Sequence, residues 1–158
     1  MLGRRWFLVS SLLREVNLKA TASNVRDFFN DQLDRYLALS GKHRADLKSP
    51  VSDGQPSGSP VGNSTENRMM NIWLAEQIVD CVGKAMCNCT KKSQQLLLGR
   101  YADDMLAYQV AMELNISAST FKRGSVGALN EFADRYEFQL VKHHIQDETK
   151  DLHIYYEP

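Results

Sequence analysis

Apolar side chains recur at helical spacing in the first third of the chain. Between residues 23 and 39 they fall three and four positions apart, which is the period of one face of an α-helix. Thr21 or Ser23 can cap the start of this helix, and Gly41 is placed to end it. A shorter apolar run over residues 4–16 predicts another helix before it. The N-terminal part of the chain is therefore expected to be helical.

The helical pattern stops in residues 49–65. This segment holds three of the four prolines and three of the nine glycines, and large apolar side chains are almost absent from it. Such a composition cannot bury enough apolar surface to offset the chain entropy that folding removes. It predicts a flexible linker or a long loop.

Helical periodicity returns after this segment. Residues 66–89 carry one apolar stripe, and Asn63 or Ser64 can cap the helix that the stripe predicts. Glu66 is placed to complete a capping box with Asn63. A further helix is expected over residues 93–101.

These elements predict an all-α protein of 158 residues in four segments. A helical N-terminal region covers residues 1–46, and a flexible Pro/Gly/Ser linker covers residues 47–65. A second helical domain covers residues 66–150. The tail, residues 151–158, is expected to form either a short strand or an ordered extended segment.

The segment 106–129 has the pattern of a helix-turn-helix. Ala111 supplies the small residue that lets the second helix cross closely, and Asn115 stands in the turn, where a positive φ is needed. Ser117 can cap the second helix, which is expected to continue towards residue 145. Phe121 would anchor that helix in the core. A helix in this position can enter the major groove of DNA.

The opposite face of the second helix carries short polar and cationic side chains. Arg123 is the candidate for a bidentate contact to guanine, and Lys122 is the candidate for a phosphate contact. Three cations that precede the motif would add contacts to the DNA backbone. The full set of predicted DNA-binding residues is Ala118, Ser119, Thr120, Lys122, Arg123, Val126, Lys91, Lys92 and Arg100.

Net charge is zero, but the charges are unevenly distributed. Residues 1–46 hold eight Lys and Arg against five Asp and Glu, and residues 91–127 hold five against three. Residues 128–158 hold three against seven. An acidic C-terminal segment therefore offsets two mildly basic ones, so the neutral sum does not argue against a DNA-binding surface around the motif.

Other polar clusters predict no metal site. Cys81, Cys87 and Cys89 lack the C-x-x-C spacing of zinc sites, and Cys81 and Cys89 fall within the apolar stripe of their helix. His143 and Asp147 stand one helical turn apart and are expected to form a solvated surface pair. No metal and no cofactor is therefore expected.

Enzymatic motifs are also absent from the sequence. No glycine-rich phosphate loop follows a strand, and neither G-x-S-x-G nor H-E-x-x-H occurs. No segment approaches the ~20 apolar residues that span a bilayer. These observations favour a non-enzymatic protein without a membrane partner. The three cysteines form no even set of pairs, which favours a reducing cytoplasm.

The motif and its flanks resemble a known family. The stretch from Leu96 to Tyr136 is similar to the promoter-binding region 4 of sigma factors, and more closely to the ArpU family of phage transcriptional regulators. The end of the linker, VGNSTEN, also resembles that family. The matching positions are Val110, Ala111, Leu114, Ile116, Ser117, Ser119, Thr120, Ala128, Leu129, Phe132, Ala133 and Tyr136.

The resemblance implies a sequence-specific DNA-binding regulator that activates late phage genes for packaging and lysis. It implies double-stranded DNA and host RNA polymerase as partners, in the cytoplasm of a bacterial host cell. Two glycines, Gly124 and Gly127, depart from a strong helix-forming sequence, and each costs about 1 kcal/mol of helix stability relative to alanine. A recognition helix that becomes more rigid on DNA is therefore expected.

A dimer is expected, since one short recognition helix buries little surface and two half-sites multiply specificity. Two alternatives remain open. One is a small DNA-packaging subunit of a phage terminase, which would assemble into a ring. The other is an adaptor that uses the helical hairpin to bind protein and binds no DNA.

Overall fold

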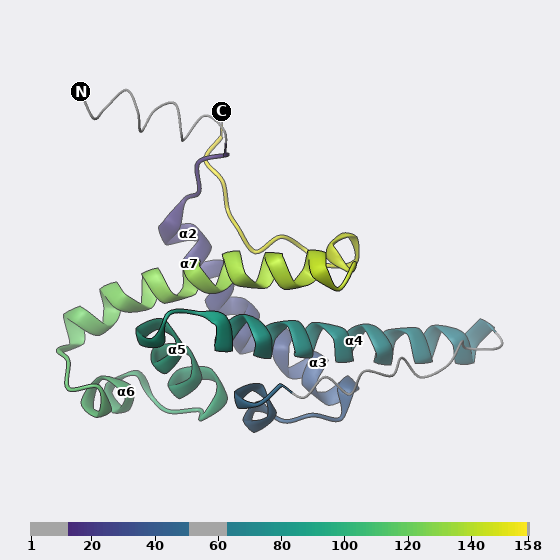
Figure 1. The fold of residues 1–158 in the computed structure, drawn as a ribbon, viewed down its shortest axis with the longest axis horizontal. Coiled ribbons are helices and arrows are strands. Elements are labelled where there is room, and N and C mark those ends of the chain that lie inside the picture. The colour runs from purple at the N-terminus through teal and green to yellow at the C-terminus, as the bar shows by residue number, and fades with distance from the viewer. Residues whose placement is uncertain (1–12, 51–62, 158) are drawn as a thin grey trace.

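The computed structural model describes residues 13–50 and 63–157 (Figure 1). Regular structure in these residues is helical, and the one β contact is an isolated bridge, so the predicted all-α class is confirmed for this part of the chain. None of the described helices is both long and apolar enough to cross a membrane. The elements are α2 (Leu18–Asp27), η1 (Phe28–Gln32), α3 (Leu33–Ser40), η2 (Arg44–Lys48), α4 (Asn63–Asn88), α5 (Lys91–Leu97), η3 (Leu98–Ala102), α6 (Ala107–Glu113), α7 (Ala118–Lys142) and η4 (Gln146–Glu148).

The helix predicted over residues 23–39 is present but begins earlier, at Leu18. Asn17 caps it, because its side-chain oxygen accepts a hydrogen bond from the backbone N–H of Ala20 at 3.1 Å. The expected caps, Thr21 and Ser23, lie inside the helix instead. Gly41 ends α3 as predicted, with φ of 70°, a left-handed conformation that glycine adopts without steric cost.

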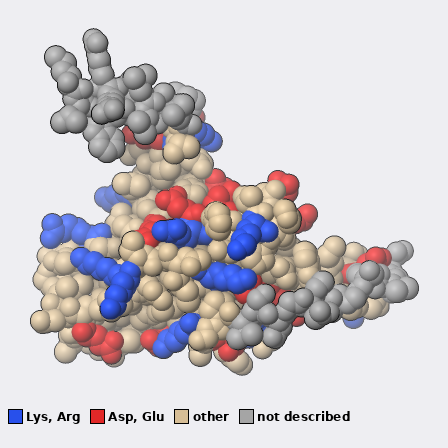
Figure 2. Space-filling view, in the orientation of Figure 1, with Lys and Arg blue, Asp and Glu red and all other residues tan. Residues whose placement is uncertain are grey.

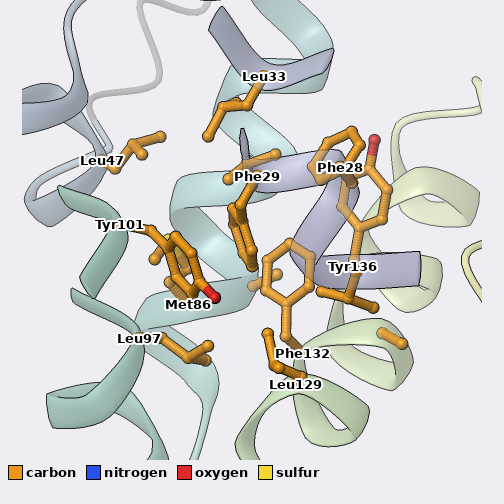
Figure 3. Packing of buried hydrophobic residues seen from close by; sticks show 14 of the residues in the cluster. Phe28, Phe29, Leu33, Leu47, Met86, Leu97, Tyr101, Leu129, Phe132 and Tyr136 are labelled. Atoms are coloured by element: carbon orange, nitrogen blue, oxygen red, sulfur yellow. The ribbon is translucent and has the colours of Figure 1, made fainter. Parts of the chain in front are cut away.

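A π-helical turn, η1, joins α2 to α3 without a break. The extra residue in this turn rotates the helix face, so the consecutive side chains of Phe28 and Phe29 are both buried. Phe29 stacks on Tyr101 with ring centroids 4.2 Å apart and lies 4.7 Å from Phe132. Phe132 in turn stacks on Tyr136 (Figure 3). These rings join η1 to η3 and α7.

One hydrophobic cluster includes side chains from both before and after residues 51–62. α4 and α7 run alongside each other in opposite directions, and α2 and α3 pack against them (Figure 1). Leu47, placed in the linker by the sequence prediction, is buried in this cluster as part of η2. The predicted linker therefore begins too early, since residue 47 belongs to η2. The centre of that linker, residues 51–62, lies outside the described residues. The same holds for the side chains of Asn63 and Ser64, the predicted caps of α4. The predicted N-terminal region and the second helical domain share a core.

The two ends of the described chain lie together. The helix predicted over residues 4–16 does not extend through 13–16, where the chain is extended and Val16 forms a single antiparallel bridge with Tyr155. The rest of that predicted helix lies outside the described residues. Thr21 fixes the tail from α2, since its hydroxyl accepts from the N–H of Ile154 at 2.9 Å. Residues 151–157 are therefore an ordered extended segment and not a strand of a sheet, which were the two alternatives for the tail.

His143 has a different partner from the one predicted. It pairs with Asp80 of α4 across 2.9 Å, and not with Asp147. α7 ends at Lys142 and His144 takes a positive φ, so the chain turns away before Asp147 reaches helical spacing from His143. Burial raises the pKa of Asp80, but hydrogen bonds from Lys84 and His143 outweigh burial and hold it below its ordinary value.

His153 holds the tail against α7. Its Nδ1 lies 2.6 Å from Asp151 and its Nε2 lies 2.7 Å from Asp134, so each ring nitrogen faces a carboxylate oxygen. Because a carboxylate accepts hydrogen bonds, both nitrogens are satisfied only in the imidazolium form. Burial lowers the pKa of His153, but the hydrogen bonds to Asp134 and Asp151 outweigh burial and raise it above 6.5.

A His153→Gln variant is therefore expected to lose stability in a pH-dependent way. A raised folded-state pKa stabilises the fold fully below the unfolded pKa, and this contribution disappears as pH rises through the folded value. The variant should be less stable than the wild type by about 1 kcal/mol near pH 5.5, and the difference should shrink towards pH 8.5. Urea unfolding across that range measures it. Asp134→Asn should show the same trend with a smaller amplitude, and a difference independent of pH would contradict the assignment.

Candidate nucleic-acid interface

α6 is held in place by its packing on η3. The side-chain oxygen of Gln109 accepts from the backbone N–H of Leu106 at 2.8 Å and so satisfies one free donor at the start of the helix. Val110 is buried and lies directly over Gly99. A Cβ at Gly99 would stand 3.0 Å from a methyl group of Val110. The glycine therefore lets α6 approach the rest of the molecule closely.

The turn between α6 and α7 has the predicted geometry. Asn115 has a φ of 55°, and the N–H of Ile116 donates to the carbonyl of Ala111 at 3.0 Å, which closes α6. Ser117 then caps α7, accepting from the N–H of Thr120 at 3.1 Å. The positive φ at Asn115 and the cap at Ser117 are both confirmed.

The first turns of α7 separate an inward face from an outward one. Phe121 packs partly buried against the core, and Ala128 and Leu129 behind it are fully buried. Lys122 and Arg123 are exposed on the outside. Of the other predicted DNA-binding positions on this helix, Ala118 and Ser119 are exposed, while Thr120 and Val126 are half-buried.

The three predicted cations ahead of the motif differ in their surroundings. Lys91 and Lys92 open α5 and are exposed. Arg100 is half-buried, because its guanidinium donates to the carbonyl of Met105 at 2.6 Å and lies over the ring of Tyr101. In the view of Figure 2, Lys and Arg side chains lie at the end of the molecule formed by α5, α6 and the start of α7, and also across its middle. Arg100 stabilises the loop before α6, whereas Lys91 and Lys92 extend into solvent.

The two glycines of α7 do not interrupt it, since the helix is continuous from Ala118 to Lys142. A Cβ at Gly124 would lie 3.3 Å from the Leu96 side chain, so this glycine permits close packing of α7 on α5. Gly127 faces open space, and nothing in the structure explains a glycine there.

A groove lies beside the motif and was not predicted from the sequence. It has a volume of about 620 Å³ and is bounded by α5, η3, α6 and the start of α7. Arg26 of α2 completes its wall, although the sequence offered no reason to group Arg26 with residues of the motif. Only the packing of α2 against α7 brings them together.

The structure thus places six of the nine predicted residues on the first turns of α7, while Lys91 and Lys92 follow Thr90, which binds Glu131 further along α7. A helix, a tight turn and a second helix present Ser119, Lys122 and Arg123 outward, with the residues behind them buried. No family model, no curated protein and no solved structure matches this chain.

Proposed function

We propose that the protein is a sequence-specific DNA-binding regulator of transcription, and that α6 and the start of α7 form its helix-turn-helix. The outward face of α7 carries the proposal. Residues 118–130 of that helix contain two charged side chains, Lys122 and Arg123. Both are positive and exposed. A cationic, carboxylate-free stretch with short polar neighbours suits the floor of the major groove, where phosphates flank the base edges.

Each contact follows from the chemistry of its side chain. Arg123 would read guanine through two parallel hydrogen bonds, because its planar guanidinium matches the O6 and N7 acceptors. Lys122 would bind phosphate, and Ser119 would donate to a phosphate or a base edge. Lys91 and Lys92 would neutralise the DNA backbone next to the motif. Arg100, already bound to Met105, would act by positioning α6.

The resemblance to the ArpU family refines the proposal. It favours an activator of late phage genes that contacts host RNA polymerase, working in the cytoplasm of a bacterial host. A dimer would place one α7 in each of two half-sites and so multiply the specificity that one helix supplies.

Selection of bound fragments from the source genome, at physiological salt, tests the proposal. We expect enrichment of one site upstream of an operon, with affinity that falls as salt rises. Replacing both Lys91 and Lys92 by glutamine should reduce the slope of log affinity against log salt by about two, since each phosphate contact contributes about 0.9. Arg35→Gln on α3, away from the motif, is the control.

Two outcomes would contradict it. Absence of any salt-dependent binding would favour the protein-binding adaptor. A large closed ring in light scattering, with binding to many unrelated fragments, would favour a DNA-packaging subunit.

A further inference from the structure

The groove beside the motif combines an apolar interior with a cationic rim. Leu97 and Leu129 are buried at its base, and Phe121 and Met112 form its sides. Its volume of about 620 Å³ falls within the range of small-molecule sites, which is roughly 300–1,000 Å³.

The charges around the groove have one sign. Among the described residues that line it, Arg26, Arg100 and Lys122 carry positive charge, and none carries a carboxylate. Arg26 and Lys122 are exposed and come from different helices, α2 and α7. Neither forms an ion pair within the described part of the chain. Two unneutralised cations beside an apolar base are the complement of a ligand with an anionic head and an apolar body.

Apolar surface extends from the groove to the solvent. Tyr108 and Met112 line it from α6 and are 60% and 74% exposed. These two residues stand four positions apart and therefore share one helix face. An unbranched methionine adapts its shape to an incoming chain at little cost. The groove thus offers apolar contact area that an incoming ligand could bury.

We propose that this groove binds a small amphipathic organic anion, an aliphatic or aromatic carboxylate, with its apolar body against Phe121, Tyr108 and Met112 and its carboxylate between Arg26 and Lys122. The volume, and walls that come from five elements (α2, α5, η3, α6 and α7), favour a small molecule over a protein segment. The site goes beyond the proposed function, although it shares Lys122 with the proposed DNA interface.

Isothermal titration calorimetry of the full chain with decanoate, decanol and decylammonium, all below micelle formation, tests the site. The three probes share an apolar chain and differ in charge. Decanoate is expected to bind about tenfold more tightly than decanol, and decylammonium more weakly than either, because two or three partly exposed cations face the head group. Shortening decanoate to octanoate should weaken binding by about two- to fourfold per CH₂.

Two matched variants locate the head group. Arg26→Gln should weaken decanoate about threefold and leave decanol unchanged, since one partly exposed ion pair is removed. Arg35→Gln, on α3 and outside the groove, should behave as the wild type. The methyl resonances of Ala111 and Met112 should shift when decanoate binds to either variant.

Several results would overturn the proposal. Equal affinity for the three probes would remove the role of charge, and equal behaviour of the two arginine variants would place the ligand elsewhere. Absence of decanoate binding, with binding of an acidic amphipathic helical peptide instead, would assign the groove to a protein partner. Self-association lost in Met112→Glu, again without decanoate binding, would assign it to a second copy. None of these measurements uses DNA. A negative result would therefore contradict the ligand site without contradicting the proposed DNA-binding function.

Discussion

Replacing Phe132 by alanine is expected to lower the free energy of unfolding by about 3–5 kcal/mol. Phe132 is fully buried and lies between Phe29 of the N-terminal helices and Tyr136 of its own helix. Truncation removes the transfer free energy of a whole ring and leaves a cavity that neighbouring rings fill only in part. Urea unfolding followed by circular dichroism measures the loss.

Phe138→Ala is the matched control, because Phe138 stands on the same helix and is 63% exposed. We expect it to change stability by no more than about 0.5 kcal/mol. Equal effects of the two substitutions would show that the ring cluster of Figure 3 does not hold the fold together.

The same experiment asks whether the chain unfolds as one unit. In a Trp6→Phe background, fluorescence of Trp73 reports on α4, while circular dichroism reports on all helices. A shared core predicts that both probes give one coincident transition, which Phe132→Ala shifts as a whole. Two separate transitions would instead mean that the regions before and after residues 51–62 are independent domains.

Replacing Arg123 by alanine is expected to weaken binding to the selected DNA site by about 1–3 kcal/mol, which is roughly 5- to 150-fold. Arg123 is exposed on the outward face of α7, so the substitution removes no buried contact and should leave unfolding unchanged. If Arg123 reads a base, the variant should also lose discrimination at one position of the site. Fluorescence anisotropy with the selected site and its single-base variants measures both effects.

Arg135→Ala separates base reading from general charge. Arg135 lies on the same helix, is also exposed, and stands outside the predicted interface. Its removal should weaken all sequences slightly and equally, through the loss of one positive charge. If Arg123→Ala did the same, Arg123 would be a phosphate contact and another residue would have to read the base.

The turn shows which features follow from neighbouring residues. The pattern of the chain predicts the left-handed φ of Asn115, the cap at Ser117 and the stop at Gly41, and all three are present. In each case the residues within one turn supply both the steric freedom and the hydrogen bond, so local sequence specifies the result. The burial of Cys81 in α4, and of Cys89 directly after α4, follows in the same way from the apolar stripe predicted over residues 66–89.

The predictions are wrong where a polar side chain has competing partners. The sequence offers Thr21 or Ser23 as the cap of a helix, but the Thr21 hydroxyl binds Ile154 of the tail, and Asn17 provides the cap. His143 was expected beside Asp147 and pairs with Asp80. The spacing of residues along one helix gave no information about side chains that another helix brings close.

The turn at Asn115, the cap at Ser117, the stop at Gly41 and the outward face of α7 are thus properties of short sequence segments, because backbone sterics and periodicity act over a few residues. The shared core, the ordered tail and the groove bounded by Arg26 depend on which helices pack together. That choice is set by the complementary shapes of buried side chains such as Phe29, Tyr101 and Phe132, summed over segments far apart in the chain. The pattern of apolar residues along the sequence identifies such side chains as apolar, but it does not predict which side chains they pack against.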